Sequence, residues 1–116
     1  MARRNSAPGL VLVMQADPGF DLPETAADER TSPDSDGYTA FLDALMAETR
    51  AFAGEVLFVH GDTHVFKLDK PLIRRSELLA NFTRLETFGS PNAHWIRVVV
   101  DPDMRGVFAI QPMIVK

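Results

Sequence analysis

Two short segments made only of apolar residues, with one amphipathic stretch between them, constrain this chain more than any other feature. Residues 10–14 read Leu-Val-Leu-Val-Met, and residues 56–59 read Val-Leu-Phe-Val. Strands that are apolar throughout are typical of a sheet that is covered on both faces. Between them, residues 38–52 place apolar side chains at steps of three and four, the period of a helix with one buried face. The order strand, helix, strand predicts a βαβ unit in which the two strands run parallel.

The rest of the chain favours short strands and turns. Asp36 can cap the start of the helix, and Gly54 can end it in a left-handed turn. Further on, the pattern predicts mostly antiparallel strands at residues 65–68, 82–88, 94–100 and 107–111, with a helical turn or irregular backbone at 76–80. The fold class that we predict is α/β, with a short parallel βαβ unit followed by mostly antiparallel strands.

Length, charge and cysteine content exclude several classes of function. A chain of 116 residues is one domain at most, and its net charge of -4 argues against general nucleic-acid binding. The absence of cysteine excludes a thiol nucleophile, a disulfide framework and a cysteine-based metal site. No apolar run is long enough for a signal-peptide core or a membrane span, so we expect no membrane partner. Residues 20–36 are rich in Asp, Glu, Pro, Ser and Thr, which predicts an acidic loop.

Polar residues follow both apolar strands. Gln15 and Asp17 come after the first strand, and His60, Asp62 and His64 come after the second. Parallel strands end at the same edge of a sheet, and open α/β sheets bind ligands at that edge. Imidazole and carboxylate groups are common ligands of divalent metal ions, and residues two apart in an extended segment project the same way. The other interpretation of this cluster is a loop in which one histidine packs in the core and Asp62 caps a turn.

The segment 56–66 resembles the part of calcineurin-like metallophosphoesterases in which a strand ends with Gly-His-x-His, both histidines being metal ligands. Gly61, Thr63 and His64 match this motif, while Asp62 stands in place of the first histidine.

Upstream, residues 11–18 are similar to the family strand that ends in a lone ligand histidine before a proline, and Gln15 occupies the place of that histidine. Downstream, residues 66–72, 81–84 and 89–98 resemble one bacterial branch of these hydrolases.

The resemblance implies that residues 1–116 are a single partial domain, the carboxy-terminal half of a metallophosphoesterase-type α/β sandwich. The family's second and third motifs, Gly-Asp-x-x-Asp and Gly-Asn-His followed by an acid, do not occur in the sequence. The first motif, Asp-x-His, does not occur apart from Asp62-Thr63-His64, which belongs to the segment matched to the last motif. By resemblance, His64, Asp62 and Gln15 are metal ligands. His60 precedes Gly61, and we interpret it as a residue behind the ligands or in the core, with metal ligation as the alternative. The implied cofactors are divalent ions (Mn, Fe, Zn or Mg), two in a complete site, and the implied substrate is a phosphoester.

Two functions from different classes follow. In the first, the chain is a fragment of a phosphoesterase that acts together with the missing amino-terminal half. In the second, it is a stand-alone, non-catalytic module that binds a ligand or protein at the same sheet edge. A domain cut in half also leaves apolar strand surface and a sheet edge uncovered, which predicts self-association or marginal stability of the isolated chain.

Overall fold

A computed structural model of the chain describes residues 7–16, 18, 39–62, 64–74, 77–91 and 93–115. The expected acidic loop at 20–36, Asp17, Asp36, Tyr38 and Thr63 lie outside the described residues. The elements are, in chain order, β1 (Gly9–Val13), α1 (Thr39–Ala51), β2 (Glu55–His60), β3 (Lys67–Asp69), β4 (Ile73–Arg74), β5 (Glu77–Leu78), β6 (Phe82–Glu86), β7 (Trp95–Val100) and β8 (Phe108–Met113). Among these residues, no helix has the length and apolar character needed to cross a membrane.

The main sheet has the strand order β1-β2-β6-β3. β1 and β2 are parallel, with α1 between them in the chain, so the predicted βαβ unit is confirmed. β6 also runs parallel to β2, and only β3 is antiparallel, pairing with β6. The expectation of mostly antiparallel strands after β2 therefore holds for the pairing of β6 with β3 but not for its pairing with β2. Since β6 is an inner strand and four of its five residues are buried, its sequence lacks the alternation of a half-exposed strand.

Two antiparallel pairs complete the fold: β4 with β5, and β7 with β8. The helical turn considered for residues 76–80 does not form, because Glu77–Leu78 pairs with Ile73–Arg74 and the Leu79 amide donates to the Leu72 carbonyl at 2.9 Å. β7 lies within the predicted range of 94–100, whereas β8 ends two residues beyond the predicted range of 107–111. The β7–β8 hairpin forms a two-stranded sheet of its own, separate from the main sheet.

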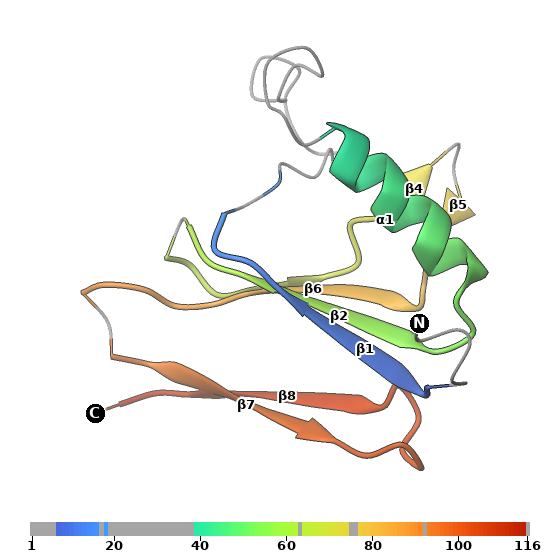
Figure 1. Cartoon of the computed structure of the whole chain (residues 1–116). Helices are drawn as coiled ribbons and strands as arrows, with labels where there is room; N and C mark the ends of the chain where they lie inside the picture. The colour runs from blue at the N-terminus through green and yellow to red at the C-terminus, as the bar shows by residue number, and fades with distance from the viewer. Residues whose placement is uncertain are drawn as a thin grey trace.

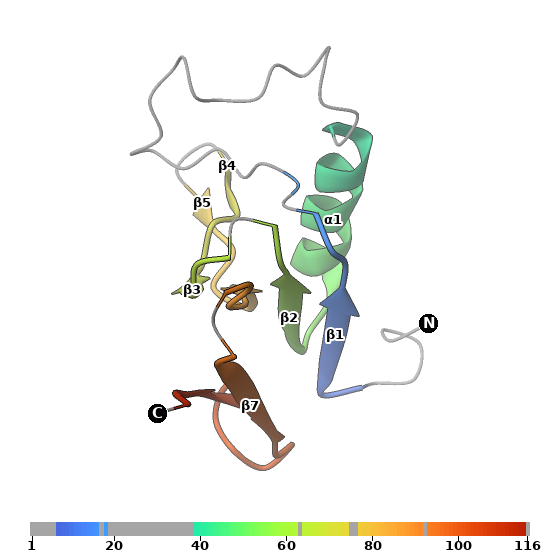
Figure 2. The same ribbon diagram turned by 90° about the vertical axis from the view of Figure 1, so that its left-hand side faces the viewer.

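The elements stack in three layers, with α1 on one face of the main sheet and the β7–β8 hairpin on the other (Figures 1 and 2). The core lies between α1 and the sheet, and its most deeply buried aromatic side chains are Phe58 and Phe82, which are 1% and 0% exposed. Leu10, Leu12 and Met14 of the first apolar run pack against this core. Burying one large apolar side chain stabilises a fold by roughly 1.5–3 kcal/mol, so this layer holds the sheet and the helix together.

The carboxyl end of α1 is fixed by a side chain from another part of the chain. The Asn81 amide nitrogen donates to the carbonyl oxygens of Thr49, Phe52 and Gly54 at 3.1, 3.2 and 3.0 Å. These hydrogen bonds satisfy carbonyl groups that a helix end leaves without intrahelical donors. Gly54 does not adopt the expected left-handed conformation. Instead, a Cβ atom there would lie 2.5 Å from the Pro8 carbonyl oxygen, so glycine is required by the close approach of two backbone segments.

Candidate functional site

The loops that follow β1 and β2 meet at the carboxyl edge of the parallel strands, as the topology predicts. Val13 lies beside Val59 in the sheet, and the Met14 amide donates to the Val59 carbonyl at 3.0 Å. One step further, the Gly61 amide donates to the Gln15 backbone carbonyl at 2.9 Å. The structure therefore places Gln15 next to the loop that contains Asp62 and His64, and all three residues are exposed.

The backbone of this loop is not extended. Asp62 has φ 99° and His64 has φ 67°, values that non-glycine residues rarely adopt. The sequence prediction assumes an extended segment in which Asp62 and His64 project the same way. The backbone of this loop does not follow that assumption. Uncommon φ values at polar residues cluster at ligand-binding sites, where surrounding contacts hold them. Here they occur at two of the predicted ligands.

The ring of His64 is held by a backbone carbonyl. Its Nδ1 atom lies 2.9 Å from the Ser90 carbonyl oxygen. A carbonyl oxygen can only accept a hydrogen bond, so Nδ1 carries the hydrogen and Nε2 presents a lone pair. Metal-binding histidines are usually fixed in this manner, by a carbonyl or carboxylate behind the ring.

Gly89 lies directly against the same ring. A Cβ atom at Gly89 would come within 2.5 Å of the Cγ and Cδ2 atoms of His64. The sequence motif does not identify Gly89 and Ser90 as part of the site; the turn pattern Gly-Ser-Pro and the resemblance noted for residues 89–98 mark this segment without assigning it a role. The segment is held in turn by aromatic contacts, since Phe88 stacks on Phe66 with ring centroids 5.5 Å apart.

His60 occupies a different environment from His64. It is 1% exposed, its Nδ1 donates to the Gly61 carbonyl at 2.7 Å, and its Nε2 accepts from the Arg84 guanidinium at 3.3 Å. Arg84 is itself buried and makes two hydrogen bonds of 2.6 Å to the Asp69 carboxylate, a bidentate pair. His60 is therefore a buried residue that contacts the Gly61 backbone below the loop.

The described residues contain no group of three or more His, Cys, Asp or Glu side chains that could hold a metal ion. The site offers the His64 imidazole and the Asp62 carboxylate from one loop, with the side-chain amide of Gln15 on the adjoining loop. Nitrogen and oxygen donors of this kind fit a divalent ion such as Mn, Fe, Zn or Mg. These three donors form only part of a complete coordination shell.

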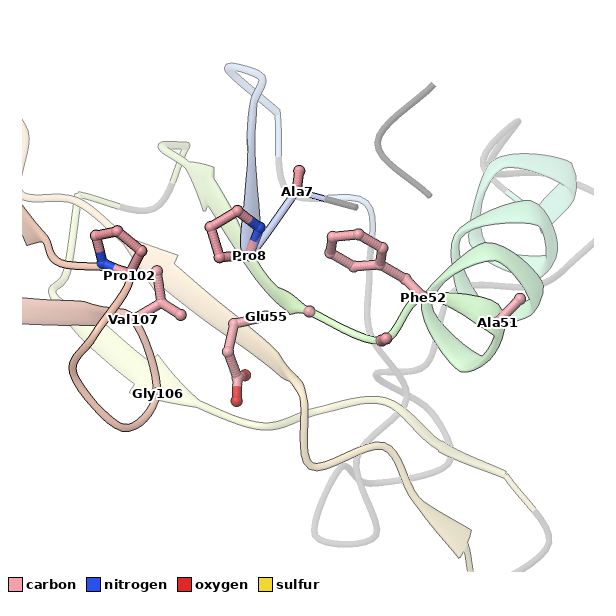
Figure 3. A pocket seen from close by; sticks show the side chains of 10 residues that line it. Ala7, Pro8, Ala51, Phe52, Glu55, Pro102, Gly106 and Val107 are labelled. Carbon is pink, nitrogen blue, oxygen red and sulfur yellow. The ribbon is translucent and has the colours of Figure 1, made fainter. Parts of the chain in front are cut away.

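Among the described residues, two cavities lie away from these loops. One, of about 450 Å³, opens at the amino ends of β1 and β2, between Pro8, Phe52, Glu55 and the turn before β8 (Figure 3). The other, of about 420 Å³, lies between the sheet and β8 and is lined mainly by apolar side chains that include Leu57 and Phe108. Neither cavity is lined by Gln15, Asp62 or His64.

Comparisons of this chain with protein-family models, with curated proteins and with solved structures found no match. The candidate site is therefore defined by its sequence motif and by the geometry of its two loops.

Proposed function

We propose that this chain contributes the carboxy-terminal wall of a metal-dependent phosphoesterase centre of the calcineurin-like kind. The observation that supports the proposal best is the state of His64. Its Nδ1 donates to the Ser90 carbonyl, which leaves the Nε2 lone pair of an exposed ring at the carboxyl edge of parallel strands. The sequence resemblance predicts a metal ligand at this residue.

Three residues have roles in the proposal. His64 supplies Nε2 and Asp62 supplies a carboxylate oxygen as ligands, while Gln15 supplies a weaker amide oxygen. His60 and the Ser90 carbonyl position this loop without touching the ion. These residues would hold a divalent ion, one of two in a complete centre, and such an ion would supply activation of water and neutralisation of charge on the phosphate oxygens. The remaining ligands come from a segment that carries the three missing motifs.

The rival function is a non-catalytic module that binds a ligand or a protein at the same edge. The amide of Gln15 and the carboxylate of Asp62, which replace two histidines of the family pattern, favour this alternative because they alter the expected ligand set. Both functions use the same loop. Metal affinity distinguishes them from a purely structural loop, and turnover distinguishes one function from the other.

Metal affinity is measured by titrating the full chain with MnCl₂ and with ZnCl₂ in a calorimeter. We expect His64→Ala and Asp62→Ala each to weaken binding by roughly tenfold or more. His94→Ala is the matched control, because it also removes an imidazole, and His94 Nδ1 already accepts a hydrogen bond from the Val115 amide at 3.1 Å. If His64→Ala and Asp62→Ala both leave the affinity unchanged while circular dichroism shows a folded chain, the site assignment is wrong.

Turnover is measured with bis(p-nitrophenyl) phosphate and manganese. Hydrolysis by the full chain that disappears in His64→Ala contradicts the non-catalytic module. Metal binding that depends on His64 without turnover agrees with a partial centre, and we then expect hydrolysis only after a polypeptide with the missing motifs is added. Absence of turnover after that addition favours the module.

A further inference from the structure

The outer edge of β7 is open within the part of the chain that the structure describes. β7 pairs only with β8, in a two-stranded sheet, and such a hairpin is marginally stable by itself in water. Its apolar side chains are exposed on both faces: Val98 by 36%, Val99 by 42%, Val100 by 59% and Trp95 by 51%. An edge strand of this kind is a template for pairing with another strand.

The hydrogen bonds of the hairpin show which backbone groups face outward. The Asp101 amide donates to the Val107 carbonyl at 2.9 Å, so Asp101 bonds inward, toward β8. Antiparallel pairs alternate, so Val99 and Arg97 also bond inward. The amide and carbonyl groups of Ile96, Val98 and Val100 therefore point to the open edge.

The two edges of the hairpin differ in their capacity to accept a strand. Pro112 of β8 lies opposite Ile96, at a position whose missing N–H would face outward. Proline at such a position blocks strand addition on that side. β7 carries no proline and no acidic residue, and Arg97 is its single charge. Strand addition is therefore favoured at β7 and disfavoured at β8.

We propose that the open edge of β7 binds a second copy of this chain, in antiparallel pairing about a two-fold axis at Val99. The two hairpins then form one continuous four-stranded sheet. Val99 faces Val99 of the partner subunit, and Val98 exchanges backbone hydrogen bonds with Val100 of the partner subunit. A two-fold axis closes the assembly at two copies.

Charge and proline positions select this register. With the axis at Val99, Arg97 lies directly opposite Asp101 of the partner subunit, and opposite charges on facing strands stabilise the pairing. An axis at Arg97 would set two arginines opposite each other. With the axis at Val99, Pro102 of the partner subunit lies opposite Ile96, at each end of the paired segment. An axis at Val100 would place Pro102 of the partner subunit opposite Val98, in the hydrogen-bonded pair next to the axis, where an amide donor is needed. An axis at Val98 would set Arg97 opposite a valine.

The mass of the full chain in solution is the first test, by sedimentation equilibrium. We expect twice the chain mass of 12.9 kDa. Arg97→Glu should raise the dimer dissociation constant about tenfold, since it replaces two ion pairs by two repulsions, and adding Asp101→Lys should restore the dimer. Val13→Lys is the control, because Val13 is 74% exposed on β1 and lies outside the proposed interface. A monomer, or open-ended oligomers, would overturn the proposal.

Crosslinking tests the register, and the chain has no cysteine to interfere. In the proposed pairing, Val99→Cys faces itself across the axis, and mild oxidation should give a covalent dimer. Val100→Cys is more exposed but lies diagonally from its own copy, beyond the 3.5–4.5 Å that a disulfide requires between Cβ atoms. A crosslink that forms as fast with Val100→Cys as with Val99→Cys would refute the axis at Val99.

Discussion

Gly89→Ala is expected to disturb the His64 ring and little else. The φ angle of Gly89 is one that alanine adopts freely, so the backbone itself does not oppose the substitution. The new Cβ atom would lie 2.5 Å from the Cγ and Cδ2 atoms of His64, which real structures do not tolerate. The ring must therefore rotate, and in doing so it loses the hydrogen bond to the Ser90 carbonyl.

The expected loss of unfolding free energy in Gly89→Ala has three contributions. Overpacking costs about 1–3 kcal/mol, and because His64 is exposed and can move, we expect the lower half of that range. The lost hydrogen bond costs roughly 1 kcal/mol. Replacement of glycine by alanine restricts the unfolded chain and returns about 0.4–1 kcal/mol. The net loss is about 1–2 kcal/mol of unfolding free energy, measured by urea denaturation.

Gly61→Ala is the matched control in the facing loop. Its Cβ atom would meet only the Gln15 carbonyl oxygen at 3.5 Å and the Thr87 hydroxyl at 3.9 Å, both ordinary contacts. This variant should be neutral or slightly stabilising. In a His64→Ala background, Cγ and Cδ2 are gone and only a Cβ contact of 3.0 Å remains, so the cost of Gly89→Ala should largely disappear. An equal cost of Gly89→Ala with and without the ring would refute this reasoning.

Three further substitutions test the framework around the site by the same denaturation assay. Asp69→Ala removes both carboxylate oxygens that accept from the buried Arg84 guanidinium and should cost about 2–3 kcal/mol of unfolding free energy. Asp69→Asn should cost about half as much. A loss below about 0.5 kcal/mol for Asp69→Ala would contradict the assigned pair. Asn81→Asp keeps the shape but presents oxygen to three carbonyl groups, so it should destabilise more than Asn81→Ala; the reverse order would show that the amide is not the donor. Phe82→Ala should cost about 3–5 kcal/mol. Phe41→Ala should cost clearly less, because the Phe41 side chain is 37% exposed. Similar losses for the two variants would contradict this assignment of the core.

The βαβ unit could be predicted from the sequence because its signals are local. Two apolar runs and one helical period specify β1, α1 and β2 without knowledge of any distant residue. The position of β6 could not be predicted in this way. Its sequence contains Arg84 and Glu86, which read as exposed positions, yet both are buried because partners from other strands reach them: Asp69 of β3 bonds Arg84, and the Lys67 amine of β3 lies 3.9 Å from Glu86. A sequence pattern does not reveal such partners.

The candidate site could likewise be predicted only in part from the sequence. The topology rule places the residues after β1 and β2 at one edge, and the contact between Gly61 and Gln15 agrees with it. The support of His64 comes from Gly89 and Ser90, which are distant in sequence and carry no chemical signature of their own. The sequence pattern indicates an extended segment, whereas Asp62 and His64 have positive φ values, which Asp and His adopt more often than most non-glycine residues.

Asn81 joins two parts of the molecule that would otherwise be able to unfold separately. Its side chain holds the end of α1, while its backbone carbonyl accepts a 2.7 Å hydrogen bond from the Val56 amide at the start of β2. The last turn of α1 therefore cannot open without releasing the first residues of β2 and β6. In native-state hydrogen exchange, the amides of these three segments should open together with one free energy, as a single cooperative unit. The loop that contains Asp62 and His64 continues from β2, so unfolding of this unit would also release the strand that anchors the candidate site.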